Sequence, residues 1–216
     1  MIKIRNIFKL YALILLCVFG SKLHAQNPFI ENKGQFPKQV KAKANLPSGS
    51  LFIEQGKLIY AFYSGEQLAA VHDLSASSKN IDAHAYVMEL VNSNSDISTR
   101  LSEESKYYEN YFLGDQSKWA ADVKSYKSLY QKNIYNGIDI QYYVDNDKLK
   151  YDIIIAPNAA TKQIKIQYKG IEKIRLQEGD LFITTSVNIV KEYQPYAYQI
   201  INGNQVEVNC VYVLKK

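Results

Sequence analysis

The sequence predicts an all-β fold: a sandwich-like domain built from antiparallel hairpins, with at most one or two short helices. Several segments alternate apolar and polar residues and are separated by turn residues, which is typical of strands with one wet face. Tyrosine, a strand-favouring residue, occurs 18 times. No long stretch shows helical periodicity, although segments 101–112 and 117–130 are ambiguous and either could hold a short helix. A composition of 47% hydrophobic and 22% charged residues excludes a disordered, collagen-like or disulfide-scaffold chain.

The first 25 residues predict a secretory signal peptide. Basic residues precede an apolar run over 10–20, and the small residue Ala25 precedes Gln26, where cleavage is expected. An apolar run of this length rises only about 16 Å as a helix, too little to cross a bilayer. We therefore expect an exported protein, periplasmic or extracellular at the cell surface, without a transmembrane segment in the mature chain. Residues 26–216 are predicted to form a single β-rich domain, with a possible internal boundary near 92–98.

The charge balance gives no sign of a nucleic-acid partner. The formal net charge is +5, but four of the 26 basic residues lie in the predicted signal peptide, which leaves 22 basic against 21 acidic residues. A nearly neutral mature chain is not expected to bind duplex nucleic acid or an anionic membrane surface.

The clearest hairpin joins segments 138–144 and 149–155 through a polar turn. Pairing Val144 with Leu149 puts the apolar residues on one face and the polar residues on the other. The register also pairs Tyr142 with Tyr151, Ile140 with Ile153, Ile138 with Ile155, Tyr143 with Lys150 and Gln141 with Asp152.

Three further hairpins are predicted. One turns at Glu178-Gly179 and pairs Leu176 with Leu181 and Ile174 with Ile183. Another turns at Gln55-Gly56 and is apolar on both faces, so it should lie centrally in the sheet. For the third we expect a three-residue loop, Asn202–Asn204, because a two-residue loop would place Tyr198 opposite Glu207 instead of Val208. Segments 84–91 and 164–168 give two more strands.

Cleavage of the signal peptide would leave Cys210 as the only cysteine, so no intramolecular disulfide is expected. A single thiol could act as a nucleophile or pair with another chain. The alternation of Val206, Val208, Cys210 and Tyr212 instead favours a buried structural cysteine on one face of a strand.

No catalytic or metal site is predicted, and no cofactor. His72 and His84 have no metal-ligand spacing. Asp139 and Asp152 lie on the wet face of one predicted hairpin, where they are either solvated carboxylates or a pair suited to glycoside hydrolysis. The oxygens of residues 145–147 suit Ca²⁺ but equally suit a turn.

The tyrosines are the most informative candidates for binding, because exposed tyrosines can stack on sugars or dock a partner. Eight of them fall within residues 107–143. We expect Tyr107, Tyr130 and Tyr143 to be exposed and to be the ligand-binding residues.

Several motifs, in their order along the chain, together resemble those of a family. They are Phe29–Gln35 (FIENKGQ), His84–Tyr86 (HAY), Asn110–Asp115 (NYFLGD), Ser117–Trp119 (SKW), Ser125–Tyr126 (SY), Asn133–Asp139 (NIYNGID), Tyr151–Pro157 (YDIIIAP) and Pro195–Gln199 (PYAYQ). The chain is similar to a domain of unknown function at the N-terminus of large secreted proteins of gliding bacteria, where it commonly precedes SBBP-type β-propeller repeats and a type IX secretion sorting domain. The family supplies no catalytic or binding residues to carry over.

These observations predict a non-catalytic extracytoplasmic β module, a binding, adhesion or scaffold domain rather than an enzyme. Its expected partners are a protein or glycan at the cell surface, or neighbouring domains of a larger assembly. The alternative is a carbohydrate-active or other hydrolase that uses a surface carboxylate pair.

Overall fold

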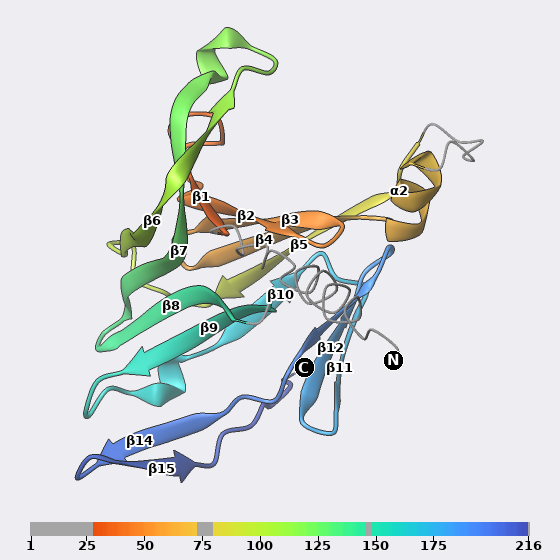
Figure 1. Ribbon diagram of the computed structural model, residues 1–216. Coiled ribbons are helices and arrows are strands. Elements are labelled where there is room, and N and C mark those ends of the chain that lie inside the picture. Colours follow the sequence, from red (N-terminus) through yellow and green to blue (C-terminus); the bar gives the residue numbers. More distant parts are fainter. Residues whose placement is uncertain (1–27, 73–79, 146–147, 216) are drawn as a thin grey trace, which may run out of the picture.

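The computed structural model describes residues 28–72, 80–145 and 148–215 (Figure 1). Its strand pairings are antiparallel. The helical elements are α2 (Gly65–His72) and the 3-10 turns η1 (Gln116–Lys118) and η2 (Thr161–Gln163). The prediction of an all-β fold is therefore confirmed. The predicted signal peptide and residues 146–147 of the predicted turn lie outside the described residues.

The largest sheet has ten strands in the order β10-β5-β4-β3-β2-β1-β7-β8-β9, with β6 paired to β7. A three-stranded sheet, β11-β12-β13, and a separate hairpin, β14-β15, follow in the chain. Among the described residues, no helix is long and apolar enough to span a membrane. The strands are β1 (Phe29–Glu31), β2 (Ala42–Leu46), β3 (Gly49–Glu54), β4 (Lys57–Tyr63), β5 (Ala83–Leu90), β6 (Ser98–Tyr111), β7 (Ala120–Tyr135), β8 (Ile138–Asp145), β9 (Lys148–Ile155), β10 (Ile166–Lys169), β11 (Lys173–Gln177), β12 (Asp180–Thr184), β13 (Ile189–Glu192), β14 (Ala197–Ile201) and β15 (Asn204–Val208).

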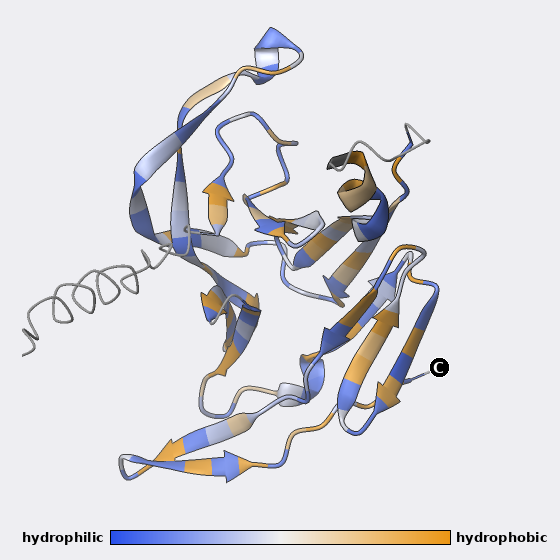
Figure 2. Ribbon diagram, turned by 45° about the vertical axis from the view of Figure 1, so that its right-hand side comes forward, coloured by the Kyte–Doolittle hydropathy of each residue, from blue (hydrophilic) through white to orange (hydrophobic). Residues whose placement is uncertain are grey.

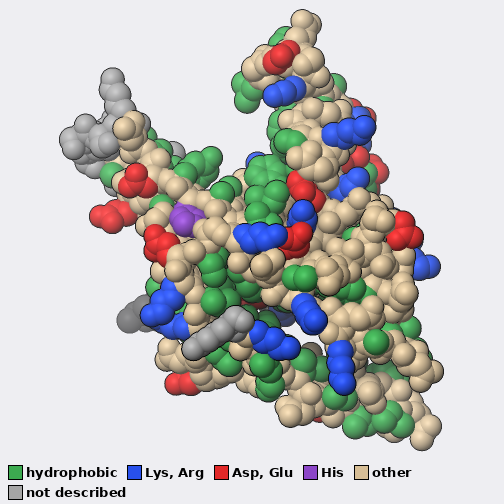
Figure 3. Space-filling model, turned by 180° about the vertical axis from the view of Figure 1, so that it is seen from behind, with side chains coloured by type: hydrophobic (Ala, Val, Ile, Leu, Met, Phe, Trp, Pro, Cys, Tyr) green, Lys and Arg blue, Asp and Glu red, His purple; other side chains and the backbone are tan. Residues whose placement is uncertain are grey.

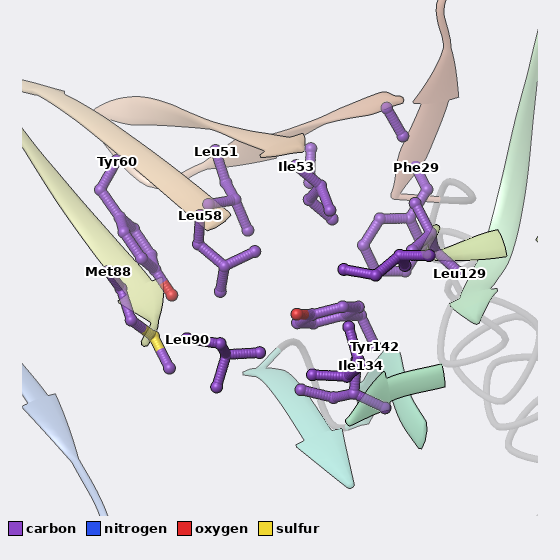
Figure 4. Close-up of a cluster of buried hydrophobic side chains, with 14 of the residues drawn as sticks. Phe29, Leu51, Ile53, Leu58, Tyr60, Met88, Leu90, Leu129, Ile134 and Tyr142 are labelled. Atoms are coloured by element: carbon purple, nitrogen blue, oxygen red, sulfur yellow. The ribbon is translucent and has the colours of Figure 1, made fainter. Parts of the chain in front are cut away.

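The core lies inside the curl of the large sheet. Side chains from β3, β4 and β5 point toward side chains from β7 and β8 (Figure 4). Leu51 and Ile53 on one side and Leu129 on the other are fully buried. Each such side chain contributes about 1.5–3 kcal/mol by leaving water. Ile183 of β12 belongs to the same cluster, so the three-stranded sheet closes part of the open side of the curl.

The hairpins with a buried face form as predicted. The β8–β9 hairpin has Tyr142 opposite Tyr151, and the β11–β12 hairpin has Leu176 opposite Leu181. The β3–β4 hairpin turns at Gln55-Gly56 and lies centrally, between β5 and β2. The backbone at Gly56 has a φ of +66°, which glycine adopts without strain. Alternation across a buried face therefore sets the strand register here.

The predicted three-residue loop at Asn202–Asn204 is wrong. Asn202 and Gly203 form a two-residue turn with φ values of 51° and 80°, as a type I′ turn requires. Tyr198 consequently pairs with Glu207. Because both faces of this hairpin are largely exposed, no buried face fixes its register, and the Asn-Gly turn decides it.

The predicted burial of Cys210 is also wrong, because its side chain is exposed and its thiol forms no disulfide within the described part of the chain. Strand β15 ends at Val208, and Val206 and Val208 themselves remain exposed. Apolar and polar residues do alternate along residues 206–212, but this segment lies away from the core. A periodic pattern identifies the faces of a strand without specifying what packs against them.

The two ambiguous segments contain the longest strands of the molecule. Residues 98–111 and 120–135 form β6 and β7, which pair with each other. The connection between these two strands contains the short 3-10 turn η1. Residues 92–98, where an internal boundary is possible, connect β5 to β6. The strands on both sides of this connection belong to the same large sheet.

Candidate interaction surfaces

Two of the three tyrosines predicted to bind ligand, Tyr130 and Tyr143, lie on one face of the large sheet. Tyr130 of β7 pairs with Gln141 of β8, and Gln141 pairs with Asp152 of β9. Tyr143 is two positions along β8 from Gln141, and alternate residues of a strand share a face. The opposite face carries the buried Tyr142. The two predicted tyrosines therefore stand on the outer side of the sheet, but each is half-buried there rather than exposed as expected, because each ring packs among neighbouring side chains of the paired strands.

Each of these tyrosines donates a hydrogen bond to one of the candidate carboxylates. Tyr130 Oη lies 2.5 Å from Asp139 Oδ2, and Tyr143 Oη lies 3.2 Å from Asp152 Oδ1. The bond to Asp139 raises the pKa of Tyr130. Partial burial, and then the charge of Asp152, raise the pKa of Tyr143. Both phenols are therefore neutral hydrogen-bond donors at neutral pH.

Asp139 also stabilises an irregularity in β7. Its Oδ1 accepts a hydrogen bond of 2.7 Å from the backbone N–H of Asn133. The backbone of Asn133 has a positive φ of 65°, and the register of β7 against β8 shifts between Gln131 and Tyr135. The carboxylate thus satisfies a donor that the shifted ladder leaves unpaired. This is a structural role for one of the two predicted acids.

An open depression of about 490 Å³ lies beside Asp139 on the outer face. Asp152 is not among the residues that line it. The two acids share a sheet face, as predicted, but they do not share this depression. The remaining lining residues are Lys132, Asn133, Gly137, Ile154, Ile155 and Ala156.

The third predicted tyrosine, Tyr107, lies on a different part of the molecule. Strands β6 and β7 continue beyond the sheet as a two-stranded arm, which stands clear of the body (Figures 1 and 3). Tyr107 is 84% exposed on this arm. Its neighbour Tyr108 lies under the ammonium group of Lys124, 5.0 Å from the ring centroid. Tyr107 is therefore exposed as expected, but it is separated from the other two tyrosines.

The end of the arm carries three exposed apolar side chains: Phe112, Leu113 and Trp119, which we call the arm tip. They are 52%, 86% and 45% exposed. The Phe112 and Trp119 rings lie 5.5 Å apart between centroids. Asp115 Oδ1 accepts a hydrogen bond of 2.9 Å from the Ser117 N–H, which closes the turn behind them. The arm tip is therefore a small apolar cluster on an ordered turn.

Sequence reasoning missed the arm tip as a site. Its residues appeared only within the motifs NYFLGD and SKW. The available signal was the placement of large apolar residues directly beside turn residues, where burial is difficult.

A second small core supports the arm just below its tip. Ile30, Ala120 and Val123 are buried together, with Phe36 and Tyr111 packed against them. The Phe36 and Tyr111 rings are 5.8 Å apart in an edge-to-face arrangement. This second core therefore holds the base of the arm tip in place.

A cluster of tyrosines around Glu192 joins the two larger sheets. Glu192 of β13 accepts hydrogen bonds from Tyr168 of β10 at 2.9 Å and from Tyr151 of β9 at 3.3 Å. Burial raises the pKa of Glu192, although these hydrogen bonds oppose the shift. The hydroxyl of Tyr86 is buried nearby and has no hydrogen-bond partner among the residues that the structure describes. The sequence carries no local signal for this cluster, because its members come from four separate strands.

His84 has a structural role at the same junction. Its Nδ1 accepts from the Ser186 hydroxyl at 2.9 Å, and its Nε2 donates to the Gly170 carbonyl at 2.6 Å. Both ring nitrogens are thus engaged in holding β5 against the segment around the three-stranded sheet. The side chain of His72 lies outside the described residues.

Residues 29–216 match the model of a protein family described as a domain of unknown function, DUF7948. The match begins in β1 and includes the outer Tyr–Asp face, the arm and the Glu192 cluster. No curated protein and no solved structure matches the chain. Because the family model covers nearly all of the sequence, the chain belongs to the DUF7948 family of domains of unknown function.

Proposed function

We propose that this chain is a non-catalytic, exported β module that binds a partner protein through the arm tip. One observation carries the proposal. Three large apolar side chains, Phe112, Leu113 and Trp119, are held exposed at the end of a projecting two-stranded arm.

Exposure of the three apolar side chains to water is unfavourable, and a partner that buries them would remove this free-energy cost. Burying a large apolar side chain contributes about 1.5–3 kcal/mol, and aromatic residues dominate the energetic centres of protein interfaces. The arm tip is small, so it suits insertion into a pocket of the partner rather than a broad flat contact. The surrounding arm is charged with both signs, as the rim of an interface commonly is.

The contacts of the candidate acids support a role without catalysis. Asp139 is occupied by Tyr130 and by the Asn133 backbone, and Asp152 accepts from Tyr143. A general acid or base must be able to exchange protons with a substrate in a shared pocket. Asp139 and Asp152 instead serve as fixed hydrogen-bond acceptors on a sheet surface. The carboxylate-pair hydrolase remains the alternative that an activity assay decides.

The outer face supports a second candidate function, glycan binding. Tyr130 and Tyr143 present aromatic rings whose hydroxyls are fixed by aspartates, with Gln141 between them in the register. Sugars bind to such a combination of aromatic surface and polar groups. A glycan array probed with wild-type protein and with Tyr143→Ala tests this candidate, with loss of any signal in the variant as the expected result.

Two features of the sequence support a proposed setting for the module. The N-terminal segment supports export, and the motif resemblance supports a place at the N-terminus of large secreted proteins of gliding bacteria. There the domain would precede propeller repeats and a type IX sorting domain, and the arm would contact either a neighbouring domain or a cell-surface protein.

Photocrosslinking in the cells that produce the protein tests the proposed site. A photoreactive phenylalanine analogue replaces Leu113 at the arm tip. In a matched control it replaces Ile189 of β13, an exposed apolar residue on another sheet. We expect a discrete protein adduct from position 113 and none from position 189. No adduct from position 113, or the same adduct from both positions, would overturn the proposal.

A further inference from the structure

The β14–β15 hairpin stands apart from the rest of the molecule. It forms its own two-stranded sheet, and Figure 1 shows it extending away from the body, with β15 on the outer side. Alternating hydrophobic and polar residues mark both strands (Figure 2). Each residue of β15 is exposed, including Val206 and Val208. A two-stranded hairpin alone is at best marginally stable in water, so this one is suited to receive further strands.

The free edge of β15 has a defined hydrogen-bonding pattern. The two-residue turn makes Ile201 and Asn204 a hydrogen-bonded pair, and such pairs alternate along the ladder. Val206 therefore directs its backbone groups inward, toward β14. Gln205 and Glu207 direct theirs outward, to the edge at which β15 has no partner strand among the described residues.

This pattern is complementary to a second copy of itself. An antiparallel β15–β15 pairing that uses the whole strand is centred on its middle residue, Val206. Gln205 then lies opposite Glu207 of the second copy, so the outward N–H and C=O groups of both strands pair. A shift of the register by one residue, with Gln205 opposite Val206 of the second copy, would set outward groups opposite inward ones.

The charges of the segment agree with the same pairing. Glu207 is the only charged residue between 197 and 214. In the register centred on Val206 it faces Gln205 rather than Glu207 of the second copy. Like charges therefore do not lie directly opposite each other, and a carboxylate faces an amide donor.

We propose that two copies of this chain associate through the free edges of β15, antiparallel and centred on Val206, to form a four-stranded sheet. This surface is separate from the arm tip and does not depend on the proposed function. The interaction is isologous, because both copies use the same residues. It is an example of strand addition at an exposed sheet edge.

Cysteine crosslinking tests the register directly. The proposed pairing brings the two Val206 Cα atoms to about 4.5 Å, within the range of a disulfide. Val206→Cys in a Cys210→Ser background should therefore form a covalent dimer on mild oxidation. Gln199→Cys in the same background is the matched control, because Gln199 pairs with Val206 inside the hairpin but lies on the other strand. We expect it to remain monomeric.

The oligomeric state of the mature chain provides an independent readout. Light scattering during size-exclusion chromatography should show a concentration-dependent dimer for wild type. Gln205→Pro should give a monomer, because proline removes an outward N–H that the hairpin itself does not use. Circular dichroism checks that this variant is folded. A wild-type monomer at all concentrations, no crosslink from Val206→Cys, or equal crosslinking of both cysteine variants would overturn the proposal.

Discussion

The hydroxyl of Tyr168 donates a hydrogen bond of 2.9 Å to Glu192 Oε1, and this contact links β10 of the large sheet to β13 of the three-stranded sheet. Tyr151 of β9 adds a second bond to the other carboxylate oxygen, at 3.3 Å. Burial disfavours the charged form of a carboxyl group, and it raises the pKa of Glu192 even though the tyrosine hydrogen bonds oppose this shift. The junction between the two sheets therefore contains a buried carboxyl group whose ionised form is disfavoured by burial.

Stability should depend on the ionisation of Glu192. Because its pKa in the folded chain is raised above the unfolded value, its contribution is fully present below the unfolded pKa of about 4.3 and is lost as pH rises through the folded pKa. Glu192→Gln cannot ionise. We expect the free energy of unfolding of wild type to fall, relative to this variant, as pH rises.

Urea denaturation at a series of pH values measures this difference. Glu172→Gln is the matched control, since Glu172 is an exposed acid at the start of the same sheet region. Its difference from wild type should change little with pH. A pH-independent difference for Glu192→Gln, or one of opposite sign, would contradict the assignment.

The hydroxyls of two neighbouring tyrosines should contribute very differently. Tyr168→Phe removes a donor to the buried carboxylate and should lower the free energy of unfolding by about 1–3 kcal/mol. Tyr86→Phe removes a buried hydroxyl that no described residue pairs by a hydrogen bond, so the free energy of unfolding should stay the same or rise slightly. Thermal denaturation of the two variants measures the difference. Equal losses of stability would show that the hydrogen bond to Glu192 does not cause the effect of Tyr168→Phe.

Asp139 should matter more for stability than Asp152. Asp139→Asn disturbs hydrogen bonds with both Tyr130 and the Asn133 backbone, and should lower stability by about 1–3 kcal/mol. Asp152→Asn affects a single, longer bond on the surface and should change stability by about 0.5 kcal/mol or less. Chemical denaturation at neutral pH compares them. Equal effects would show that Asp139 has no special role in the β7 irregularity.

The strand register could be predicted from the sequence where one face of a hairpin is buried, and could not where both faces are exposed. The β8–β9 register followed from alternation because Ile140, Tyr142 and Ile153 pack on the core side. The β14–β15 register and the exposure of Cys210 did not follow, because no buried face constrains that segment. In its place the Asn202-Gly203 turn determines the pairing, through local backbone preference.

The site could be predicted only in part, for a related reason. The sequence placed Tyr143, Asp139 and Asp152 on one wet face, because that face belongs to a hairpin with a definite register. It did not place Tyr130 there, since the pairing of β7 with β8 joins strands whose register the sequence did not predict. It did not predict the arm, since segments 101–112 and 117–130 have an ambiguous pattern and either could hold a short helix. Nor could it predict the Glu192 cluster, whose contacts join β9, β10 and β13 across the interior.

We expect purified mature protein to show no turnover on a panel of glycosidase, esterase and peptidase substrates. The reason is that both candidate acids are engaged by tyrosine hydroxyls on an open sheet surface. Asp152→Asn, which should fold normally, serves as the control. Turnover in wild type that disappears in this variant would establish the hydrolase alternative.

The most direct test of the central claim is a competition experiment on the surface of the cells that produce the protein. Labelled wild-type module is displaced by unlabelled wild type, by an arm-tip variant (Phe112→Ser, Leu113→Ser and Trp119→Ser) or by the Ile189→Ser control. Because interface hot spots each contribute about 2 kcal/mol or more, the arm-tip variant should compete at least about 30-fold less well than wild type. The control should compete like wild type. Equal competition by the arm-tip variant and wild type would contradict the account.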